Sequence, residues 1–253
     1  MKIIAISNQK GGVGKTTTTV NLAASFVNMK KKVLLIDLDP QGNATSGGGI
    51  NKSQIQHSIY DVLIGDISLN KIILKSEESF FDIAPANQDL AGAEIDLVGI
   101  QDREYMLKNA INALKKSYDY ILIDCPPTSN LQTVNALVAA TAVLIPMQCE
   151  YYALEGLSDL VNTIKRVKKQ LNPKIEIEGL LRTLFDKRNT LAQQVSDELS
   201  SHFGSKVYKT IIPRNVRLAE APSHGKAALF YDKSSKGAKA YLALAEEMLR
   251  GNA

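Results

Sequence analysis

Residues 2–18 read KIIAISNQKGGVGKTTT, and no other part of the chain constrains the expected fold as strongly. The apolar start, residues 2–7, predicts a buried strand. A glycine-rich loop follows at residues 9–14, and residues 15–29 have a helical pattern. Glycines let backbone N–H groups turn inward around a phosphate, and a helix N-terminus adds its dipole. The order of strand, loop and helix therefore predicts a site for the phosphates of a nucleotide.

Two side chains at the start of the helix complete this predicted site. Lys15 supplies a cation, and the Thr16 hydroxyl is a suitable ligand for Mg²⁺. The usual pattern GxxxxGK[ST] has glycine where Gln9 stands, and a second lysine stands at the loop entrance, which makes this departure the most diagnostic feature of the sequence. We expect nucleotide contacts from one continuous run: Lys10, Gly11, Gly12, Val13, Gly14, Lys15, Thr16 and Thr17.

Short apolar runs alternate with longer amphipathic stretches along the whole chain, which is typical of an α/β fold. Several runs are apolar throughout, as expected of strands that helices cover on both faces. We therefore predict one domain over residues 1–253, with a mostly parallel, twisted sheet and helices on both faces. Residues 42–50, rich in Gly, Ser, Thr and Asn, are expected to form a mobile loop. The expected strands are residues 2–7, 33–37, 81–85, 120–124, 142–146, 175–184 and 207–212, and the clearest helices are residues 15–29, 103–116, 130–140, 154–171, 190–203 and 236–250.

Three aspartates stand at the ends of two predicted strands. The second strand runs into Asp37 and Asp39, and the strand at residues 120–124 ends on Asp124. Ligands of parallel sheets bind beyond the carboxyl ends of the strands. These carboxylates are therefore placed to orient Mg²⁺ or a water near a γ-phosphate, and we expect Asp37, Asp124 and Thr16 around the metal. For Asp37 a second interpretation stays open, namely a helix N-cap or a turn residue.

Composition excludes several classes of protein. The chain is 45% hydrophobic, enough to bury a full core. No run approaches the roughly 18 apolar residues that a membrane span requires. The only cysteines are Cys125 and Cys149, so we expect neither a disulfide framework nor a CxxC metal site. A soluble protein in a reducing, cytoplasmic setting is the resulting expectation.

Charge is distributed unevenly along the chain. Residues 1–160 carry 13 basic and 17 acidic side chains, whereas residues 161–253 carry 17 basic and 9 acidic ones. The C-terminal third is therefore where a polyanion is expected to bind.

The loop KGGVGKT at residues 10–16 is similar to the deviant Walker A loop of a P-loop NTPase family. That family includes the partitioning ATPases ParA and Soj, the division-site protein MinD and the nitrogenase iron protein. The resemblance implies ATP and Mg²⁺ as cofactors, weak intrinsic ATP hydrolysis, and a Lys10 that reaches the nucleotide of a partner subunit, so that ATP controls dimerisation. It implies catalytic roles for Lys10, Lys15 and Asp39, of which Asp39 positions the attacking water, and Asp124 resembles the Walker B aspartate.

Beyond the loop, the chain resembles the chromosomal ParA/Soj branch over nearly its whole length. A MinD-like membrane-associated ATPase is the alternative, but it requires a basic amphipathic C-terminal helix, and Glu246 and Glu247 oppose this. A nitrogenase-type role requires cluster-binding cysteines, and Cys125 and Cys149 lie outside that setting, so we expect them to be buried small residues. The matching segments include DLDPQGNATSG at 37–47, LAGAEIDLV at 90–98, DCPP at 124–127, QCEYYALEGL at 148–157 and YKTIIPRNVRLAEAPSHGK at 208–226.

The ParA/Soj resemblance implies an ATP-bound homodimer that binds double-stranded DNA without sequence preference, at the nucleoid in the cytoplasm. It also implies a ParB-like centromere-binding partner that stimulates hydrolysis and release, while no membrane partner is expected. From the family's late loop, Pro213 and Asn215 are the expected adenine contacts. Candidate contacts to DNA phosphates are Arg188, Arg214, Arg217, Lys226 and Lys236, with Lys233 and Lys239 as further basic residues of the same region.

The chain departs from the ParA/Soj pattern at two places. Arg182 stands where similar chains have an apolar residue, and we expect either an edge contact or a local ion pair from it. Residues 128–131 read TSNL where the family often has SLGL. This departure falls in the second of two expected switch segments, which are residues 41–45 and 126–130.

Overall fold

A seven-stranded sheet forms the centre of the molecule. The computed structural model describes residues 1–151 and 153–251. The strands follow the order β3-β4-β2-β5-β1-β6-β7, and every neighbouring pair is parallel except β3 with β4. The predicted, mostly parallel α/β sheet is thus confirmed. The strands are β1 (Lys2–Ile6), β2 (Val33–Asp37), β3 (Leu74–Lys75), β4 (Asp82–Ala84), β5 (Tyr120–Asp124), β6 (Ala142–Met147) and β7 (Glu176–Arg182).

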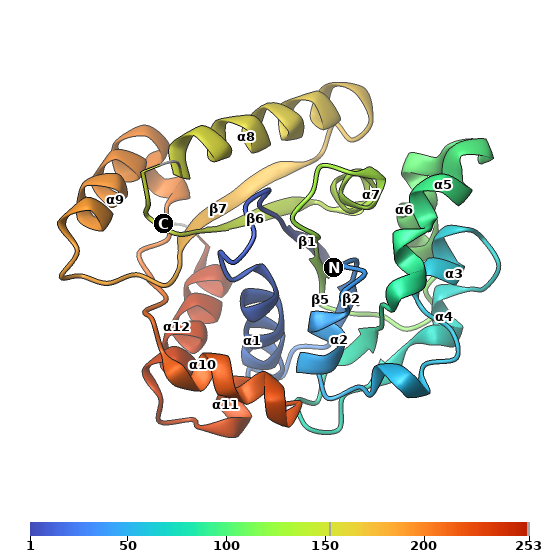
Figure 1. The fold of residues 1–253 in the computed structure, drawn as a ribbon, viewed down its shortest axis with the longest axis horizontal. Helices are drawn as coiled ribbons and strands as arrows, with labels where there is room; N and C mark the ends of the chain where they lie inside the picture. The colour runs from blue at the N-terminus through green and yellow to red at the C-terminus, as the bar shows by residue number, and fades with distance from the viewer. Residues whose placement is uncertain (152, 252–253) are drawn as a thin grey trace.

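Helices cover both faces of the sheet (Figure 1). One face packs against α1 (Lys15–Asn28), α2 (Asn43–Gly47), α10 (Val216–Glu220), α11 (Ala228–Tyr231) and α12 (Lys236–Arg250). The other packs against α3 (Ile59–Leu63), α4 (Leu69–Ile72), α5 (Ala93–Asp96), α6 (Met106–Asn112), α7 (Leu131–Ala139), α8 (Ala153–Gln170) and α9 (Thr190–Phe203). Within the described residues, no helix is both long and apolar enough to span a bilayer.

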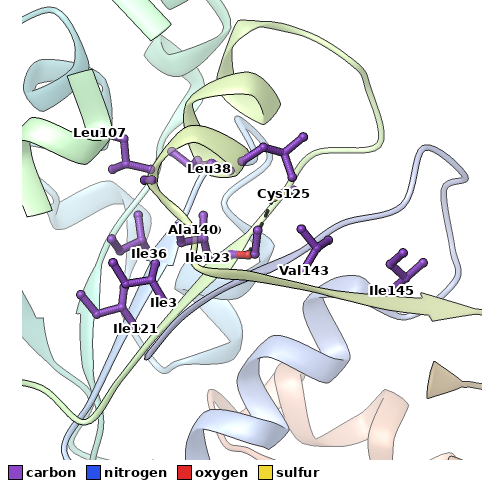
Figure 2. Close-up of a cluster of buried hydrophobic side chains, with 14 of the residues drawn as sticks. Ile3, Ile36, Leu38, Leu107, Ile121, Ile123, Cys125, Ala140, Val143 and Ile145 are labelled. Atoms are coloured by element: carbon purple, nitrogen blue, oxygen red, sulfur yellow. Dashed lines mark hydrogen bonds between the residues drawn. The ribbon is translucent and has the colours of Figure 1, made fainter. Parts of the chain in front are cut away.

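Strand side chains alternate between two cores although the strands are apolar throughout. Ile3 of β1 and Ile121 of β5 are in register and pack into the core that α6 and α7 cover, which Figure 2 shows. Ile4 and Leu122, one residue further along each strand, pack into the opposite core against α1 and α12. Strands with both faces buried have no polar face, which explains the continuous apolar runs of the sequence.

Residues 207–212, predicted as a strand, do not form one. They lie beside β7 and form one isolated bridge with it, Leu180 with Val207, while the backbone N–H of Ile212 donates to the Arg182 carbonyl oxygen at 2.9 Å. A second isolated bridge, Phe185 with Pro213, follows just beyond both segments. The predicted sheet is therefore wrong at this edge. The other predicted strands agree with the structure to within one or two residues at each end.

Arg182 explains why the ladder stops beside β7. Its guanidinium donates to the Tyr208 carbonyl oxygen at 2.5 Å and to the Ser196 hydroxyl at 2.8 Å. The Glu247 carboxylate accepts the backbone N–H groups of residues 209 and 210 at 2.7 and 2.9 Å. Because side chains satisfy these backbone groups, the segment needs no strand partner there. The edge contact, one of the two roles expected for Arg182, is confirmed.

Residues 42–50, predicted as a mobile loop, contain α2 instead. The N-cap residue Gly42 has a left-handed backbone with φ of 61°, and Ala44 and Thr45 are fully buried. Asp37 accepts hydrogen bonds from the backbone N–H and the hydroxyl of Thr45. A carboxylate from the preceding strand therefore holds a helix whose own glycine-rich sequence does not favour it.

The helix predicted over residues 103–116 is shorter than expected. Arg103–Tyr105 form a 3₁₀ turn, and α6 ends at Asn112. Beyond it, the backbone N–H of Lys115 donates to the Asn70 side chain at 2.8 Å. A tertiary contact thus replaces the helical hydrogen bond.

Candidate nucleotide-binding site

The loop between β1 and α1 lies beside the carboxyl ends of β2 and β5. The sheet order β2-β5-β1 brings these strand ends together, and Asp37 is in register with Asp124. Gly12 and Gly14 have left-handed backbones, with φ of 76° and 85°. Residues with side chains rarely adopt this conformation, so the tight turn of the loop requires glycine at both positions.

Side chains outside the loop hold it in place. Thr183, just after β7, donates its hydroxyl hydrogen to the Val13 carbonyl oxygen at 2.7 Å. Asn8 donates to the Pro146 carbonyl oxygen at 2.8 Å and accepts from the backbone N–H of Lys10 at 2.9 Å. Sequence reasoning missed Thr183 and Asn8, because a single polar residue at a strand end carries no spacing signal.

Lys15 is buried at the start of α1, with 7% of its surface exposed. Its Nζ donates to the Lys10 carbonyl oxygen at 2.9 Å, so the side chain folds over the loop. Burial lowers the pKa of Lys15, and the negative charges of Asp124 and Asp39 oppose this effect. A cation held in this way can neutralise phosphate oxygens that enter the loop.

Asp124 and Thr16, two of the predicted metal-binding residues, are in direct contact. The Thr16 hydroxyl donates to one carboxylate oxygen of Asp124 at 2.7 Å, and the Thr19 hydroxyl donates to the other at 2.9 Å. Burial raises the pKa of Asp124, and the neighbouring charge of Asp37 adds to the rise. A divalent cation would stabilise the charged carboxylate, and Mg²⁺ binds oxygen ligands of this kind. The residues present therefore fit a Mg²⁺ site.

Asp37 is fully buried and has protein partners at both oxygens. One oxygen accepts from the backbone N–H of Asp39 at 3.1 Å, and the other accepts two hydrogen bonds from Thr45 at 2.7 and 2.8 Å. Burial raises the pKa of Asp37, and the hydrogen bonds from Thr45 oppose the rise. Asp37 thus acts as a turn residue through Asp39 and holds α2 through Thr45, but the N-cap residue of α2 is Gly42, and a place of Asp37 near the metal stays a prediction.

An open cavity of about 370 Å³ lies against the loop, and we call it the phosphate pocket. Asp39 accepts from the backbone N–H of Gln41 at 2.9 Å, which holds its carboxylate at the pocket wall. Both expected switch segments reach the same cavity as the loop. The lining residues are Gly11, Gly12, Gly14, Lys15, Thr16, Thr17, Asp39, Gln41, Asn43 and Pro127.

A second cavity, of about 190 Å³, adjoins the phosphate pocket and shares Gly12, Gly14 and Thr17 with it. Mostly apolar walls beside a phosphate site suit a purine base. We therefore call this cavity the base pocket. Its other walls come from the late part of the chain: Thr183, Leu184, Ile212, Asn215, Leu218, Ala219 and Tyr241.

Asn215 lies in the base pocket, whereas Pro213 is not among its lining residues. Within the described residues, the buried Oδ1 of Asn215 has no hydrogen-bond partner. An exocyclic amino group in the pocket could satisfy this oxygen once the Asn215 amide turns toward the pocket. Pro213 instead pairs with Phe185 beside the sheet, so of the two expected adenine contacts the structure places only Asn215 at the pocket.

Of the late residues of the base pocket only Asn215 was predicted, and two of the others, Leu184 and Tyr241, show how the pocket is built. Leu184 has a left-handed backbone with φ of 50°, which is strained for a bulky side chain and is typical of functional sites. Tyr241 of α12 is 1% exposed, and its hydroxyl shares a hydrogen bond with that of Thr18 at 3.0 Å. The C-terminal helix is thereby fixed to α1 and helps to shape the pocket.

Lys10 is not among the residues that line the phosphate pocket. Its Nζ lies 2.5 Å from a carboxylate oxygen of Glu150, and the two side chains are 44% and 49% exposed. Gly11 beside it is exposed, and a Cβ added there would meet no atom within 4 Å. The outer side of the loop therefore presents Lys10 and Gly11 to solvent.

Two of the predicted DNA contacts, Arg188 and Arg214, lie near one carboxylate. The side chain of Arg188 is 90% exposed and donates to Asp186 at 2.8 Å. Hydrogen bonds from Arg188, together with the charge of Arg214, lower the pKa of Asp186 to about 2. These arginines are therefore neighbours at the surface, as a shared DNA-binding surface would require.

The other three predicted DNA contacts also lie outside the core. Arg217 pairs with Glu220 at 2.7 Å and with Asp232 at 3.3 Å. Lys226 pairs with a carboxylate of the turn between β3 and β4 at 2.9 Å, and Lys236 is exposed at the first position of α12. Exposed ion pairs of this kind contribute little stability, so phosphates can replace the carboxylates at small cost.

Cys125 and Cys149 are both free and buried. Burial raises the pKa of both thiols. The expectation of buried small residues is confirmed.

Comparisons with known proteins show to which family the chain belongs. A protein-family model described as an AAA domain matches residues 1–177. The chain is 56% identical to the sporulation initiation inhibitor protein Soj of Bacillus subtilis over 247 residues, which cover 98% of each chain. It is 51% identical to the chromosome partitioning protein ParA of Myxococcus xanthus over 249 residues, covering 98% of this chain and 88% of that protein. The chain belongs to the ParA/Soj family of P-loop ATPases.

Solved structures show the same fold as this ParA/Soj chain. Cobyrinic acid a,c-diamide synthase from Mycobacterium smegmatis, with bound ATP analog and magnesium, matches with a TM-score of 0.87 and 36% identity, covering 99% of this chain and 95% of that one. MinD from Pyrococcus horikoshii, complexed with Mg-ADP, matches with a TM-score of 0.80 and 28% identity, covering 100% and 98%. The P-loop NTPase fold expected from the sequence is thereby confirmed.

Proposed function

We propose that the protein is an ATP-dependent DNA-partitioning ATPase. ATP with Mg²⁺ occupies the phosphate and base pockets, two subunits close around the nucleotides, and the dimer binds double-stranded DNA without sequence preference. A ParB-like centromere-binding protein stimulates hydrolysis and release during segregation of a chromosome or plasmid. Similarity to proteins named for chromosome partitioning supports this proposal.

The contact between Thr16 and Asp124, 2.7 Å long and beside Lys15, is the observation that carries the nucleotide part. Thr16 and Asp124 would hold Mg²⁺, which would supply positive charge beside the nucleotide phosphates. Asp39 lines the same pocket and can hold the attacking water. Phosphoryl transfer needs positioning and charge stabilisation rather than covalent chemistry, so these groups suffice for slow hydrolysis.

Lys10 provides the proposed link between ATP and dimerisation. Two ATP molecules between two subunits concentrate negative charge, which a lysine donated by the partner neutralises. The exposed position of Lys10 leaves it free to reach outward once its ion pair with Glu150 is exchanged for phosphate.

Gly11→Val tests this dimer with a substitution that causes no steric clash within the monomer. A valine Cβ has open space at residue 11, and the backbone there is not left-handed. We expect loss of ATP-dependent dimerisation in light scattering, because the two loops meet at this point in the proposed dimer. Gly11 also lines the phosphate pocket, so ATP affinity is measured in parallel and dimerisation is compared at saturating ATP. Unchanged dimerisation would contradict the proposed packing.

Binding of duplex DNA with ADP, ATP and a non-hydrolysable ATP analogue, measured over a salt series, tests the whole proposal. We expect binding with ATP and the analogue and weak binding with ADP, with log K falling by about 0.9 per log unit of salt for each phosphate contacted. Arg217→Ala should reduce that slope by about 1. Lys71→Ala, at an exposed lysine of α4, is the control. Equal affinity with every nucleotide would overturn the switch.

A MinD-like membrane-associated ATPase is the alternative, favoured by the likeness to MinD. The end of α12 argues against it, because Arg250 is the only basic residue of its last turn and Glu247 is engaged with the backbone of residues 209 and 210. Sedimentation with anionic phospholipid vesicles and ATP separates the two functions. Vesicle binding without duplex binding would replace our proposal.

A further inference from the structure

One groove of the molecule has no part in the proposed nucleotide cycle. It lies between α8, the start of β7 and the end of α9, and its volume is about 350 Å³. Thr183, after the other end of β7, contacts the glycine loop, so the groove and the nucleotide site lie at opposite ends of this strand. We call it the α8–β7 groove. Its lining is Val161, Ile164, Lys165, Lys168, Ile175, Glu176, Ile177, Phe203 and Lys206.

The floor of the α8–β7 groove is apolar and only partly covered. Ile164 and Ile175 are buried, whereas Val161, Ile177 and Phe203 pack against the core with part of their surface still exposed. Water in contact with a concave apolar surface is displaced favourably by an apolar ligand. The floor alone therefore suits aliphatic or aromatic side chains.

Three exposed lysines, Lys165, Lys168 and Lys206, stand at the rim of this floor. Within the part of the chain that the structure describes, none of them is paired with a carboxylate. The dipole of α8 favours cations in its last turn, which accounts for Lys168. It does not account for Lys165, more than a turn from the helix end, or for Lys206, which comes from the segment after α9.

The edge of β7 is open beside the groove. β7 is the last strand of the sheet, and within the described residues pairing along its outer edge begins only at Leu180, with Val207. Glu176 and Ile177, which line the groove, precede that pairing. An exposed strand edge offers backbone hydrogen bonds to an extended peptide.

We propose that the α8–β7 groove binds an acidic amphipathic segment of a protein partner. The apolar side chains of the bound segment cover Val161, Ile177 and Phe203, and its carboxylates face the three lysines of the groove. DNA supplies negative charge but no aliphatic side chains for the floor. A membrane surface binds protruding apolar groups rather than a concave floor. Only a peptide matches the charge of the lysines, the concave shape of the floor and the open strand edge together. The proposal does not depend on ATP.

Two synthetic peptides of about twelve residues test this proposal. The probe is a fluorescein-labelled peptide of alternating leucine and glutamate, and its matched control replaces every leucine with serine at the same net charge. Fluorescence anisotropy is measured with the full-length protein without nucleotide. We expect the leucine peptide to bind at least about tenfold more tightly than the serine peptide, because only it covers the floor.

Variants locate the binding to this groove. The double substitution Lys165→Glu with Lys206→Glu should weaken binding of the leucine peptide at least about tenfold, and Val161→Asp should do the same through the floor. Lys71→Glu, a charge reversal at an exposed lysine of α4, should bind the probe as the wild type does. Melting curves and ATP binding show whether each variant is folded.

Several results would overturn the proposal. These are no binding of the leucine peptide, equal binding of the serine peptide, or variants that are folded and bind normally. Displacement of the probe by duplex DNA would assign the groove to the DNA surface. If the wild type binds vesicles and Val161→Asp abolishes this binding, the groove belongs to a membrane-binding surface. If the double variant has a lower sedimentation coefficient than the wild type, the groove binds a second copy of the chain.

Discussion

The phosphate pocket and the base pocket adjoin, yet the chain builds them in different ways. The loop and helix that wall the phosphate pocket are one continuous run, to which two strand ends add residues such as Asp39 and Pro127. The base pocket shares part of that run, but its remaining walls come from residues 183–184, 212–219 and 241. One pocket is therefore mostly local in sequence, and the other is assembled by tertiary packing.

The two pockets should therefore respond differently to changes elsewhere in the chain. Phosphate contacts depend on backbone conformation, which Gly12 and Gly14 impose locally. The base pocket depends on long-range ties, such as the hydrogen bond between Tyr241 and Thr18. Substitutions in the two pockets should accordingly separate loss of nucleotide binding from loss of base selectivity.

The largest effect is expected at Lys15, in the phosphate pocket. Lys15→Ala removes a cation held within the loop, and we expect ATP affinity to fall on the order of 100-fold or more, by analogy with the removal of other preorganised electrostatic groups. Calorimetric titration with ATP measures this, and Lys71→Ala on α4 is the control. Affinity near that of the wild type would contradict the assignment of the loop as a phosphate site.

Asp39→Ala should separate binding from hydrolysis within the same pocket. The carboxylate lies at the pocket wall and is not part of the glycine loop, so ATP binding should be retained. We expect hydrolysis to fall about 100-fold, because a water that is no longer oriented reacts slowly. The variant should persist as an ATP dimer on DNA. Phosphate release assays test the rate, Asp66→Ala serves as control, and rapid turnover would refute the role of Asp39.

Sequence reasoning predicted the phosphate half of the site because local geometry determines it. A strand, a loop with glycines at 12 and 14, and a helix can be recognised without tertiary information, and Asp124 follows from the end of an apolar run. The sheet was predictable for the same reason, since strands such as β2 are buried over their full length. The glycine loop and each apolar strand can thus be recognised from short continuous stretches of sequence.

The rest depended on contacts that no spacing reveals. Residues 207–212 look like a strand, but the side chains of Arg182 and Glu247 satisfy three of their backbone groups, so the pairing with β7 is interrupted. Residues 42–50 look like a loop, but Asp37 holds a helix there by accepting two hydrogen bonds from Thr45. In each case a polar side chain outside the segment accepts or donates these hydrogen bonds, and the local propensity of the segment is overruled.

A smaller effect is expected from pH, through Asp124. Its pKa in the folded protein is raised above the ordinary 3.8, mainly by burial. A carboxyl group with a raised pKa binds its proton more tightly in the folded state, so its share of stability is lost as pH rises from about 4 through the folded pKa. Through Asp124, the nucleotide-free protein should therefore melt at a higher temperature at about pH 5 than at about pH 8. Asp124→Asn should make the melting temperature less dependent on pH.

Scanning fluorimetry over pH checks this, with Asp66→Asn as a control at an exposed carboxylate. Asp37 also has a raised pKa, so a residual slope should remain in Asp124→Asn. Mg²⁺ with ATP should reverse part of the wild-type loss, because a divalent cation favours the charged carboxylate. An identical profile in wild type and Asp124→Asn would show that this group does not carry the dependence.

The smallest effect, and the sharpest test of the base pocket, is expected at Asn215. Within the described residues its Oδ1 has no partner, so once the amide turns toward the pocket it can accept from the amino group of adenine, whereas guanine presents an oxygen at that position. A net hydrogen bond is worth about 0.5–1.5 kcal/mol, so Asn215→Ala should weaken ATP binding about two- to tenfold and GTP binding less. Pro213→Ala, beside the pocket but outside its lining, should change neither affinity. Equal losses for ATP and GTP would mean that Asn215 shapes the pocket without reading the base, and the two pockets would then differ in construction but not in selectivity.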